Sequence, residues 1–295
     1  MVENKTYKAK IAKAALLIFL GIIALSCLFP LWYTFCLSIS KKQAVDAGLV
    51  TFRPIGFSVY NYDKIVGDSV FLHSMWVSIK RVVIGTPLSL LIIVLFAYPL
   101  SKSKKEFRLR NIFMWMVLFF MLFSPGLIPW YIFMKKYGMI NNFWGLVLAG
   151  GIPSYYTILV MNFFRNFSKD IEEAAIIDGA DQWTLLFKIV VPCSIPIIAT
   201  IALFIGVEYW NEYYIGMLLS TGNAHYPLMT YIQSLSVQLN TSANMTPDQL
   251  KKIASMSTDG LNAAKVFVAL IPMLVVYPFV SKYFVSGIMI GSVKE

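Results

Sequence analysis

The sequence predicts an all-α membrane protein that crosses the bilayer six times within a single domain, residues 1–295. Hydrophobic residues make up 58% of the chain and charged residues 14%, and the mean hydropathy is +0.68. This composition is too apolar for a soluble domain. Six apolar segments are long enough to span a membrane as helices. They are residues 14–38, 82–100, 112–133, 143–164, 190–219 and 263–285.

The basic residues predict which side of the membrane is cytoplasmic. The first thirteen residues carry four lysines against one glutamate, and the segment 102–110 carries five basic residues and one acid. Clustered Lys and Arg mark cytoplasmic segments, and an even number of spans returns the chain to the side on which it began. We therefore expect both termini in the cytoplasm and place the net charge of +10 against lipid headgroups rather than nucleic acid. The longer segments 40–70 and 220–262 should be exterior, the second with a short helix capped by Thr246.

Two spans carry residues that affect how they cross the bilayer. Lys80 and Arg81 precede the second span, where we expect their side chains to reach the outer headgroups, with attraction of an anionic solute as the alternative. Pro125, Gly126 and Pro129 interrupt the third span and predict a kink or a break.

The longest polar interruption on the side predicted to be cytoplasmic, residues 168–190, predicts a bent element. Ser168 can cap a helix whose first turn is acidic, and Gly179 can take the left-handed conformation that ends it. Asp181 can cap a second helix that runs into the fifth span. The segment 165–188 holds five acids against three basic residues, so we expect it to meet a basic protein surface rather than anionic lipid. A solvated loop is the alternative.

This segment also carries a specific resemblance. The residues in question are Glu173-Ala174-Ala175, Asp178-Gly179-Ala180, Phe187, Ile189, Pro192 and Pro196. In this order and spacing they resemble the EAA motif of ABC importer permeases, where the motif forms the coupling helix that docks into the cytoplasmic ATPase. One departure is that Phe167-Ser168 stands where the family usually has Ile-Pro.

Two further regions of the sequence narrow the resemblance to one group of ABC importer permeases. The segments concerned are 77–79, 84–86, 97–101, 269–272, 277–279, 282–285, 287 and 291–294. They resemble the MalG-like carbohydrate-uptake permeases, and particularly their LplC-like branch. Ser281 and Glu295 depart from that branch, and the second change adds a negative charge to a tail that reaches the ATPase in the maltose-type relatives.

The resemblance implies a type I ABC importer (MetI-like) permease fold in the cell membrane and a role in ATP-driven uptake of carbohydrate, particularly an oligosaccharide. It implies as partners a second homologous permease, two ATPase subunits that bind ATP and Mg, and an extracytoplasmic solute-binding protein. It implies no cofactor, no metal and no catalysis on this chain. The ATPase-coupling residues that it implies are Glu172, Glu173, Ala174, Ala175, Asp178, Gly179 and Ala180.

The fifth span contains two carboxylates, Glu208 and Glu212, within a sequence rich in tyrosine and tryptophan. Four residues separate them, so they share a helix face. Ionisable groups in a membrane usually face a polar cavity, and aromatic faces suit sugar rings. We therefore expect a solute path at Glu208, Tyr209, Trp210, Asn211 and Glu212. Helix–helix hydrogen bonding is the alternative role for these residues.

Two other function classes stay open from the residues alone. The solute could be a non-sugar such as a peptide. Aromatic residues also form ordinary interface belts, so their presence does not distinguish a sugar from a peptide. A polytopic enzyme of glycan or lipid metabolism would have to use Glu208 and Glu212 as an acid–base pair. The sequence contains no G-x-x-x-x-G-K-[ST] motif, so ATP hydrolysis by that route belongs to another polypeptide.

Overall fold

A computed structural model describes residues 7–151, 153–222, 225–241 and 259–292. Within these ranges the regular elements are helices, and the one isolated β-bridge pairs Ser40 with Phe57. The prediction of an all-α chain is confirmed. Thr246, the predicted helix cap, and Glu295, the added charge of the C-terminal tail, lie outside the described residues.

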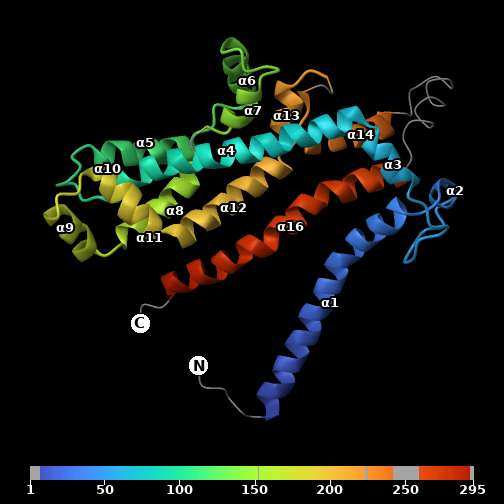
Figure 1. Cartoon of the computed structure of the whole chain (residues 1–295), viewed down its shortest axis with the longest axis horizontal. Helices are drawn as coiled ribbons and strands as arrows, with labels where there is room; N and C mark the ends of the chain where they lie inside the picture. The colour runs from blue at the N-terminus through green and yellow to red at the C-terminus, as the bar shows by residue number, and fades with distance from the viewer. Residues whose placement is uncertain (1–6, 152, 223–224, 242–258, 293–295) are drawn as a thin grey trace. The chain divides into compact units, whose positions relative to one another are not determined.

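The helices are drawn in Figure 1. Their bounds are α1 Tyr7–Ser38, α2 Lys42–Asp46, α3 Tyr60–Val66, α4 Ser69–Ser101, α5 Arg110–Leu122, α6 Leu127–Lys136, α7 Phe143–Leu148, α8 Ser154–Arg165, α9 Lys169–Ile177, α10 Gln182–Thr184, the π-helical η1 Leu185–Val190, α11 Val191–Cys193, α12 Ile195–Asn211, α13 Tyr214–Leu219, α14 Leu228–Thr241 and α16 Asp259–Ser292.

The chain forms two compact units, the first comprising residues 1–72 and 234–271. A small core of Cys36, Ala44, Val45 and Val50 packs the end of α1 against α2. The Asn61 side chain donates to the Ser38 carbonyl at 2.9 Å, which ties α3 to the same end of α1.

An ion pair joins distant parts of the first unit. Lys265 Nζ of α16 lies 2.6 Å from Asp68 Oδ2, and the Lys265 side chain is 6% exposed. Asp68 also accepts the backbone N–H of Phe71 at 3.0 Å and so caps the first turn of α4. One carboxylate therefore fixes both the start of α4 and the position of α16 within this unit.

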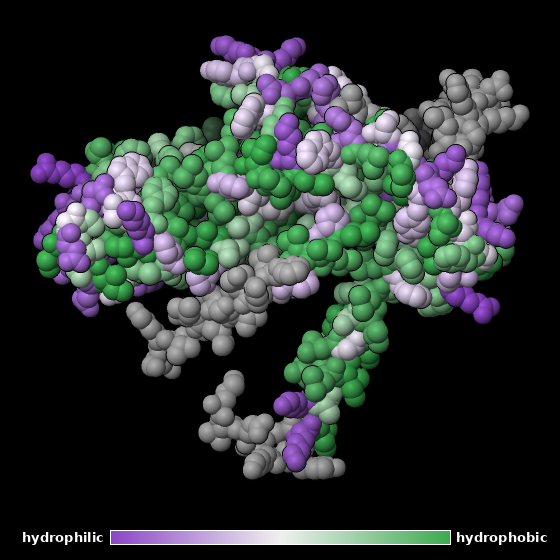
Figure 2. Space-filling view, in the orientation of Figure 1, coloured by the Kyte–Doolittle hydropathy of each residue, from purple (hydrophilic) through white to green (hydrophobic). Residues whose placement is uncertain are grey.

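Helix α1 is apolar on all sides. The large hydrophobic side chains from Ile11 to Leu31 are exposed, and burial begins near Cys36. Figure 2 shows hydrophobic residues over most of this helix, with hydrophilic residues near its N-terminal end. A helix that is hydrophobic all round requires lipid or another subunit around it.

The second unit comprises residues 73–233 and 272–295. Its main core gathers side chains from α4, α5, α8, η1 and α12, including Ile93, Val160, Leu185 and Ile201. Figure 1 shows α9 and α10 at the end of this unit where α4 finishes. Hydrophilic residues gather at that same end in Figure 2.

The predicted break in the third span is confirmed. Helix α5 ends at Leu122 and α6 begins at Leu127, and the two are bent by 112°. Gly126 has a φ of +80°, a conformation that glycine adopts without steric cost. The segment expected as the fourth span is also divided, into α7 and α8, around Pro153.

Three described helices are long and apolar enough to cross a membrane, or up to five if each bent pair counts as one span. They are Lys10–Ser38, Ser69–Ser101 and Asp259–Val276, and the bent pairs are α5 with α6 and α10–α11 with α12. The single-domain division and the count of six spans stay predictions, since α8 has only 12 residues. Helix α4 begins at Ser69, well before the apolar segment that predicted it.

Candidate coupling element and membrane cavity

The bent element between α8 and α12 has the predicted turn. Gly179 follows α9 with a φ of +86°. Its N–H donates to the Ile176 carbonyl at 3.0 Å, and the next N–H, of Ala180, donates to the Ala175 carbonyl at 2.9 Å. These bonds satisfy carbonyls at the helix end, as glycine C-caps generally do. The prediction that Gly179 ends this helix is confirmed.

Asp181 caps the next helix as predicted, since its carboxylate accepts the backbone N–H of Thr184 at 3.1 Å. Hydrogen bonds from the Thr184 side chain and from its backbone N–H lower the pKa of Asp181. The expected cap at Ser168 is wrong in part, because Ser168 occupies the cap position of α9 but its side chain makes no capping hydrogen bond.

The second helix is not regular. Residues Leu185–Val190 form a π-helical turn between α10 and α11. Pro192 is the second residue after this turn and has no N–H to donate to the carbonyl four residues earlier. Sequence periodicity predicted an ordinary α-helix here, and periodicity alone does not show a change of helix type.

The alanines and the charged residues of the motif have different environments. Ala175 is 8% exposed and packs in the main core, and Ala180 packs against that core. Glu173, Asp178 and Gly179 are exposed. Ala175 and Ala180 therefore let the element pack closely on the helix bundle, whereas Glu173, Ala174, Asp178 and Gly179 are available to a partner.

Glu172 differs from the other acids because it is paired within the chain. Its Oε2 lies 2.5 Å from Lys102 Nζ, and the two side chains are 17% and 13% exposed. The Lys102 ammonium also lies over the Tyr98 ring, 4.5 Å from its centroid, and the Tyr98 hydroxyl donates to Gln182 Oε1 at 3.0 Å. This network fastens both limbs of the element to the end of α4.

The outer surface of the element is apolar as well as acidic. Ile177 is 84% exposed, Trp183 is 63% exposed and Ile176 is 51% exposed. The Trp183 and Phe187 rings stack with centroids 6.1 Å apart. Sequence reasoning assigned the partner contact to charge and missed this apolar tip, although isoleucines at the end of an acidic helix were a visible signal. We refer below to Ile176, Ile177 and Trp183 as the apolar tip.

The second cluster lies within the membrane segment of the second unit, around Arg81. Arg81 is 1% exposed. Its Nε donates to the Leu146 carbonyl at 2.9 Å, and its Nη1 lies 3.0 Å from Glu212 Oε2. The expectation that Arg81 reaches outer headgroups is therefore wrong, because the buried guanidinium has the half-buried Glu212 carboxylate and the Leu146 carbonyl as partners.

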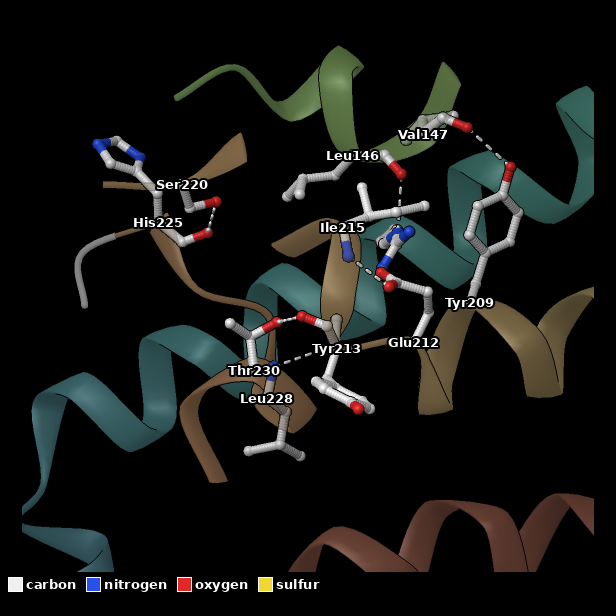
Figure 3. Close-up of polar contacts among 12 residues, drawn as sticks. Leu146, Val147, Tyr209, Glu212, Tyr213, Ile215, Ser220, His225, Leu228 and Thr230 are labelled. Atoms are coloured by element: carbon white, nitrogen blue, oxygen red, sulfur yellow. Dashed lines mark hydrogen bonds and ion pairs between the residues drawn. The ribbon is translucent and has the colours of Figure 1, made fainter. Parts of the chain in front are cut away.

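Glu212 and Tyr209 complete this cluster, shown in Figure 3. Glu212 Oε1 accepts the backbone N–H of Ile215 at 2.5 Å, and the Tyr209 hydroxyl donates to the Val147 carbonyl at 2.9 Å. The Tyr209 ring lies against Gly85, where an added Cβ would come within 2.8 Å of it. Side chains thus satisfy the backbone at the end of α7 and at the start of α13, as broken helices in a membrane require.

Beside the cluster is a cavity of about 330 Å³. It is lined by Arg81, Ser89, Gly150, Gly151, Pro153, Ser154, Tyr155, Tyr156, Ile205, Glu208, Tyr209, Glu212 and Ile215. Of the expected path residues, Glu208, Tyr209 and Glu212 line this cavity. Trp210 is 4% exposed and Asn211 is exposed, and neither lines it. Among the described residues no group of three or more His, Cys, Asp or Glu side chains could hold a metal ion.

The helical bundle, its broken spans and its projecting element define an integral membrane component of a transporter. Residues 85–288 match the family described as the binding-protein-dependent transport system inner membrane component, and the chain belongs to this family. It is therefore a transport permease subunit and not an enzyme, with no cofactor implied on this chain. Such a permease generally works with a partner permease, an ATPase and a binding protein.

Relatives match over nearly the full chain. The polygalacturonan/rhamnogalacturonan transport system permease protein YtcP of Bacillus subtilis is 35% identical, over 94% of this chain and 96% of its own. Protein LplC of the same organism is 31% identical, over 99% and 97%. A chain from the crystal structure of a bacterial ABC transporter involved in the import of the acidic polysaccharide alginate superposes with a TM-score of 0.85. It is 31% identical, with 95% and 98% of the two chains covered. The MetI-like permease fold is confirmed.

Proposed function

We propose that this chain is a permease subunit of an ABC importer for an oligosaccharide. The observation that carries this proposal is the near full-length similarity to a permease named for polygalacturonan and rhamnogalacturonan transport and to a transporter involved in alginate import. The cavity supports it, because Tyr155, Tyr156 and Glu208 offer aromatic faces and a hydroxyl acceptor.

In this proposal the chain forms half of the translocation path. The other half comes from a second homologous permease, and the two permeases stand on two ATPase subunits that bind ATP and Mg. An extracytoplasmic solute-binding protein delivers the oligosaccharide. Both termini and the coupling element, residues 168–190, lie in the cytoplasm, as the basic residues near Lys10 and Lys104 favour.

The coupling element contacts the ATPase through two kinds of group. Glu173 and Asp178 are exposed and supply charge, while Ile177 and Trp183 supply apolar area. Ala175 and Ala180 hold the element on the core, and Glu172 holds it on Lys102. Movement of the ATPase on binding ATP would then move the end of α4 together with the element.

The solute path passes the cavity beside α12. Glu208 and Tyr209 line it directly, and Glu212 borders it while paired with Arg81. Asn211 stays part of the proposed path because it is exposed on the adjoining surface of α12, whereas Trp210 is buried and would support the path from behind.

The test is reconstitution of the complete importer in vesicles with its binding protein and a labelled oligosaccharide. ATP-dependent uptake that requires this chain is expected. Glu173→Lys and Gly179→Val should uncouple ATP hydrolysis from uptake, since the first reverses an exposed charge and the second places a β-branched residue at a positive φ. Wild-type ATPase retention and solute-stimulated hydrolysis in both variants would place the coupling contact elsewhere.

A further inference from the structure

The charges around the membrane cavity are distributed unequally. Three charged side chains line it: the cation Arg81 and the carboxylates Glu208 and Glu212. Arg81 and Glu212 form an ion pair, whereas Glu208 makes no ion pair among the residues that the structure describes. We propose that this cavity binds an uncharged sugar unit through its hydroxyl groups and excludes sugars that carry a carboxylate. The proposal rests on the proposed path.

Arg81 cannot serve as the anchor for an anionic solute. Its side chain is 2% exposed, and its guanidinium already binds Glu212 and the Leu146 carbonyl. The face of the group lies over the Tyr209 ring, with Cζ 5.1 Å from the ring centroid. The Glu212 carboxylate already balances the charge of this cation, and a solute carboxylate would have to compete with Glu212 for it.

Glu208 is the charged group that a solute can reach. It is exposed, and among the described residues its recorded hydrogen-bond partner is the Tyr156 hydroxyl, which donates to Oε1. A carboxylate accepts several hydrogen bonds, so Oε2 stays available for the hydroxyl groups of a sugar. A carboxylate on the solute would instead meet a like charge at short range in a site of reduced dielectric constant.

The remaining lining groups are uncharged. They include Ser89, Gly150, Ser154 and Tyr155. The neighbouring basic residue of α4, Lys80, lies over the Phe143 ring at 4.6 Å from its centroid and lines a different pocket, with His73. Within the described chain, no unpaired cation therefore lines the cavity.

The charge of the cavity lining favours a different solute from the acidic sugars in the names of the relatives. Polygalacturonan is a polymer of carboxylated sugars, and alginate is named as an acidic polysaccharide. A cavity whose accessible charge is Glu208 does not suit such units. The solute class that it fits is a neutral oligosaccharide or a neutral segment of a branched one.

The experiment measures the charge of the cavity directly. Tyr155, which is 58% exposed and lines the cavity, is changed to Cys in the assembled importer after Cys27, Cys36 and Cys193 are changed to Ala. The cysteine is treated with three methanethiosulfonate reagents: a neutral one, an anionic one with a sulfonate group and a cationic one with an ammonium group. The reaction rate of each reagent is divided by its rate with a small thiol in solution, which corrects for differences in intrinsic reactivity. We expect the anionic reagent to react about tenfold more slowly than the neutral one, and the cationic reagent faster.

The matched control is Tyr155→Cys with Glu208→Gln, which keeps the site and its shape but removes the charge. The anionic reagent should then approach the neutral rate. Equal rates with Glu208 present, no change in Glu208→Gln, or no reaction with any reagent would overturn the proposal. Retention of the ATPase in each purified variant shows that it is assembled.

A second measurement distinguishes this inference from the proposed function. Uptake of a galacturonate trimer by the wild-type importer at the rate of a galactose trimer would contradict exclusion. If neither trimer nor any other oligosaccharide is carried, while the labelling pattern is as expected, the cavity has the inferred charge and the transport proposal fails alone.

Discussion

Lys102 Nζ at the end of α4 and Glu172 Oε2 of α9 lie 2.5 Å apart, 70 residues away from each other in sequence. This pair joins the membrane bundle to the element that should meet the ATPase. The neighbouring Tyr98–Gln182 hydrogen bond makes a second connection from α4 to the other limb of the element. Both limbs should therefore move with α4 as one body.

We expect Lys102→Glu and Glu172→Lys each to reduce solute-stimulated ATP hydrolysis, since each places like charges in contact. The double variant, Lys102→Glu with Glu172→Lys, restores opposite charges and should recover most of the activity. Because the pair is only partly buried, the loss in each single variant should be a few-fold, equivalent to about 1 kcal/mol of coupling. The measurement is ATPase activity of the purified complex with and without solute-loaded binding protein.

A control variant and a contrary outcome decide how these single and double variants are interpreted. Lys105→Glu is the matched control, since Lys105 is exposed and makes no ion pair within the described chain. It should change activity little. A double variant no better than the worse single variant would show that Lys102 and Glu172 act separately, and that the pair does not transmit movement.

Much of the coupling element could be predicted from sequence because its signals are local. Gly179 and Asp181 act on backbone groups within a few residues of themselves, so residue type and spacing were sufficient. The pairing of Glu172 with Lys102 could not be derived in this way. It depends on how α4 and α9 pack, and the sequence shows only that both residues are charged.

The membrane cluster shows the same limit more clearly. An arginine beside an apolar segment and a glutamate inside another were both visible in the sequence. Their separation of 131 positions gave no indication that they pair. The rule that lysine and arginine near span ends reach the interface was applied to Arg81, but α4 begins earlier than its apolar segment and places Arg81 inside the bundle. Tertiary packing decided the outcome.

The proposed orientation of the chain predicts from which side of the membrane introduced cysteines can be labelled. Cysteines at Lys104 and Asp178 should react with an impermeant reagent only from the cytoplasm, and a cysteine at Tyr60 only from outside. All three positions are exposed. Each cysteine is introduced into a chain in which Cys27, Cys36 and Cys193 have been replaced. Reaction of Lys104→Cys and Tyr60→Cys from the same side would contradict the proposed topology, because α4 would then not cross the membrane between them.

The Arg81–Glu212 ion pair gives a stability prediction. Arg81→Met should destabilise the chain by about 3–5 kcal/mol, since it leaves Glu212 without its cation and the Leu146 carbonyl without its donor. The double variant Arg81→Met with Glu212→Gln should lose less than Arg81→Met alone, because the uncompensated charge is gone. Thermal unfolding of the detergent-purified complex measures both.

The control for this pair is Arg108→Met, at an exposed arginine of the segment between α4 and α5, which should be within about 0.5 kcal/mol of wild type. If Arg81→Met is equally mild, the ion pair contributes little. A double variant less stable than the single one would indicate that Glu212 is held mainly by the Ile215 N–H rather than by Arg81.

The apolar tip gives the last prediction, which concerns how the ATPase is held. Ile177 is 84% exposed at the end of α9, and full burial of such a side chain stabilises a contact by about 1.5–3 kcal/mol. Ile177→Ser should therefore weaken retention of the ATPase about tenfold or more while leaving the fold intact, because Ile177 has almost no contact within the chain.

Ile171→Ser, on the same helix and 46% exposed, provides the comparison. Six positions separate Ile171 from Ile177, so the two lie on different faces of α9 and only Ile177 belongs to the tip. Retention is measured by titrating purified ATPase onto permease complexes in detergent. An equal loss in both variants would mean that the ATPase covers the whole helix, whereas no loss with Ile177→Ser would leave Glu173 and Asp178 as the principal contacts and make docking depend strongly on salt.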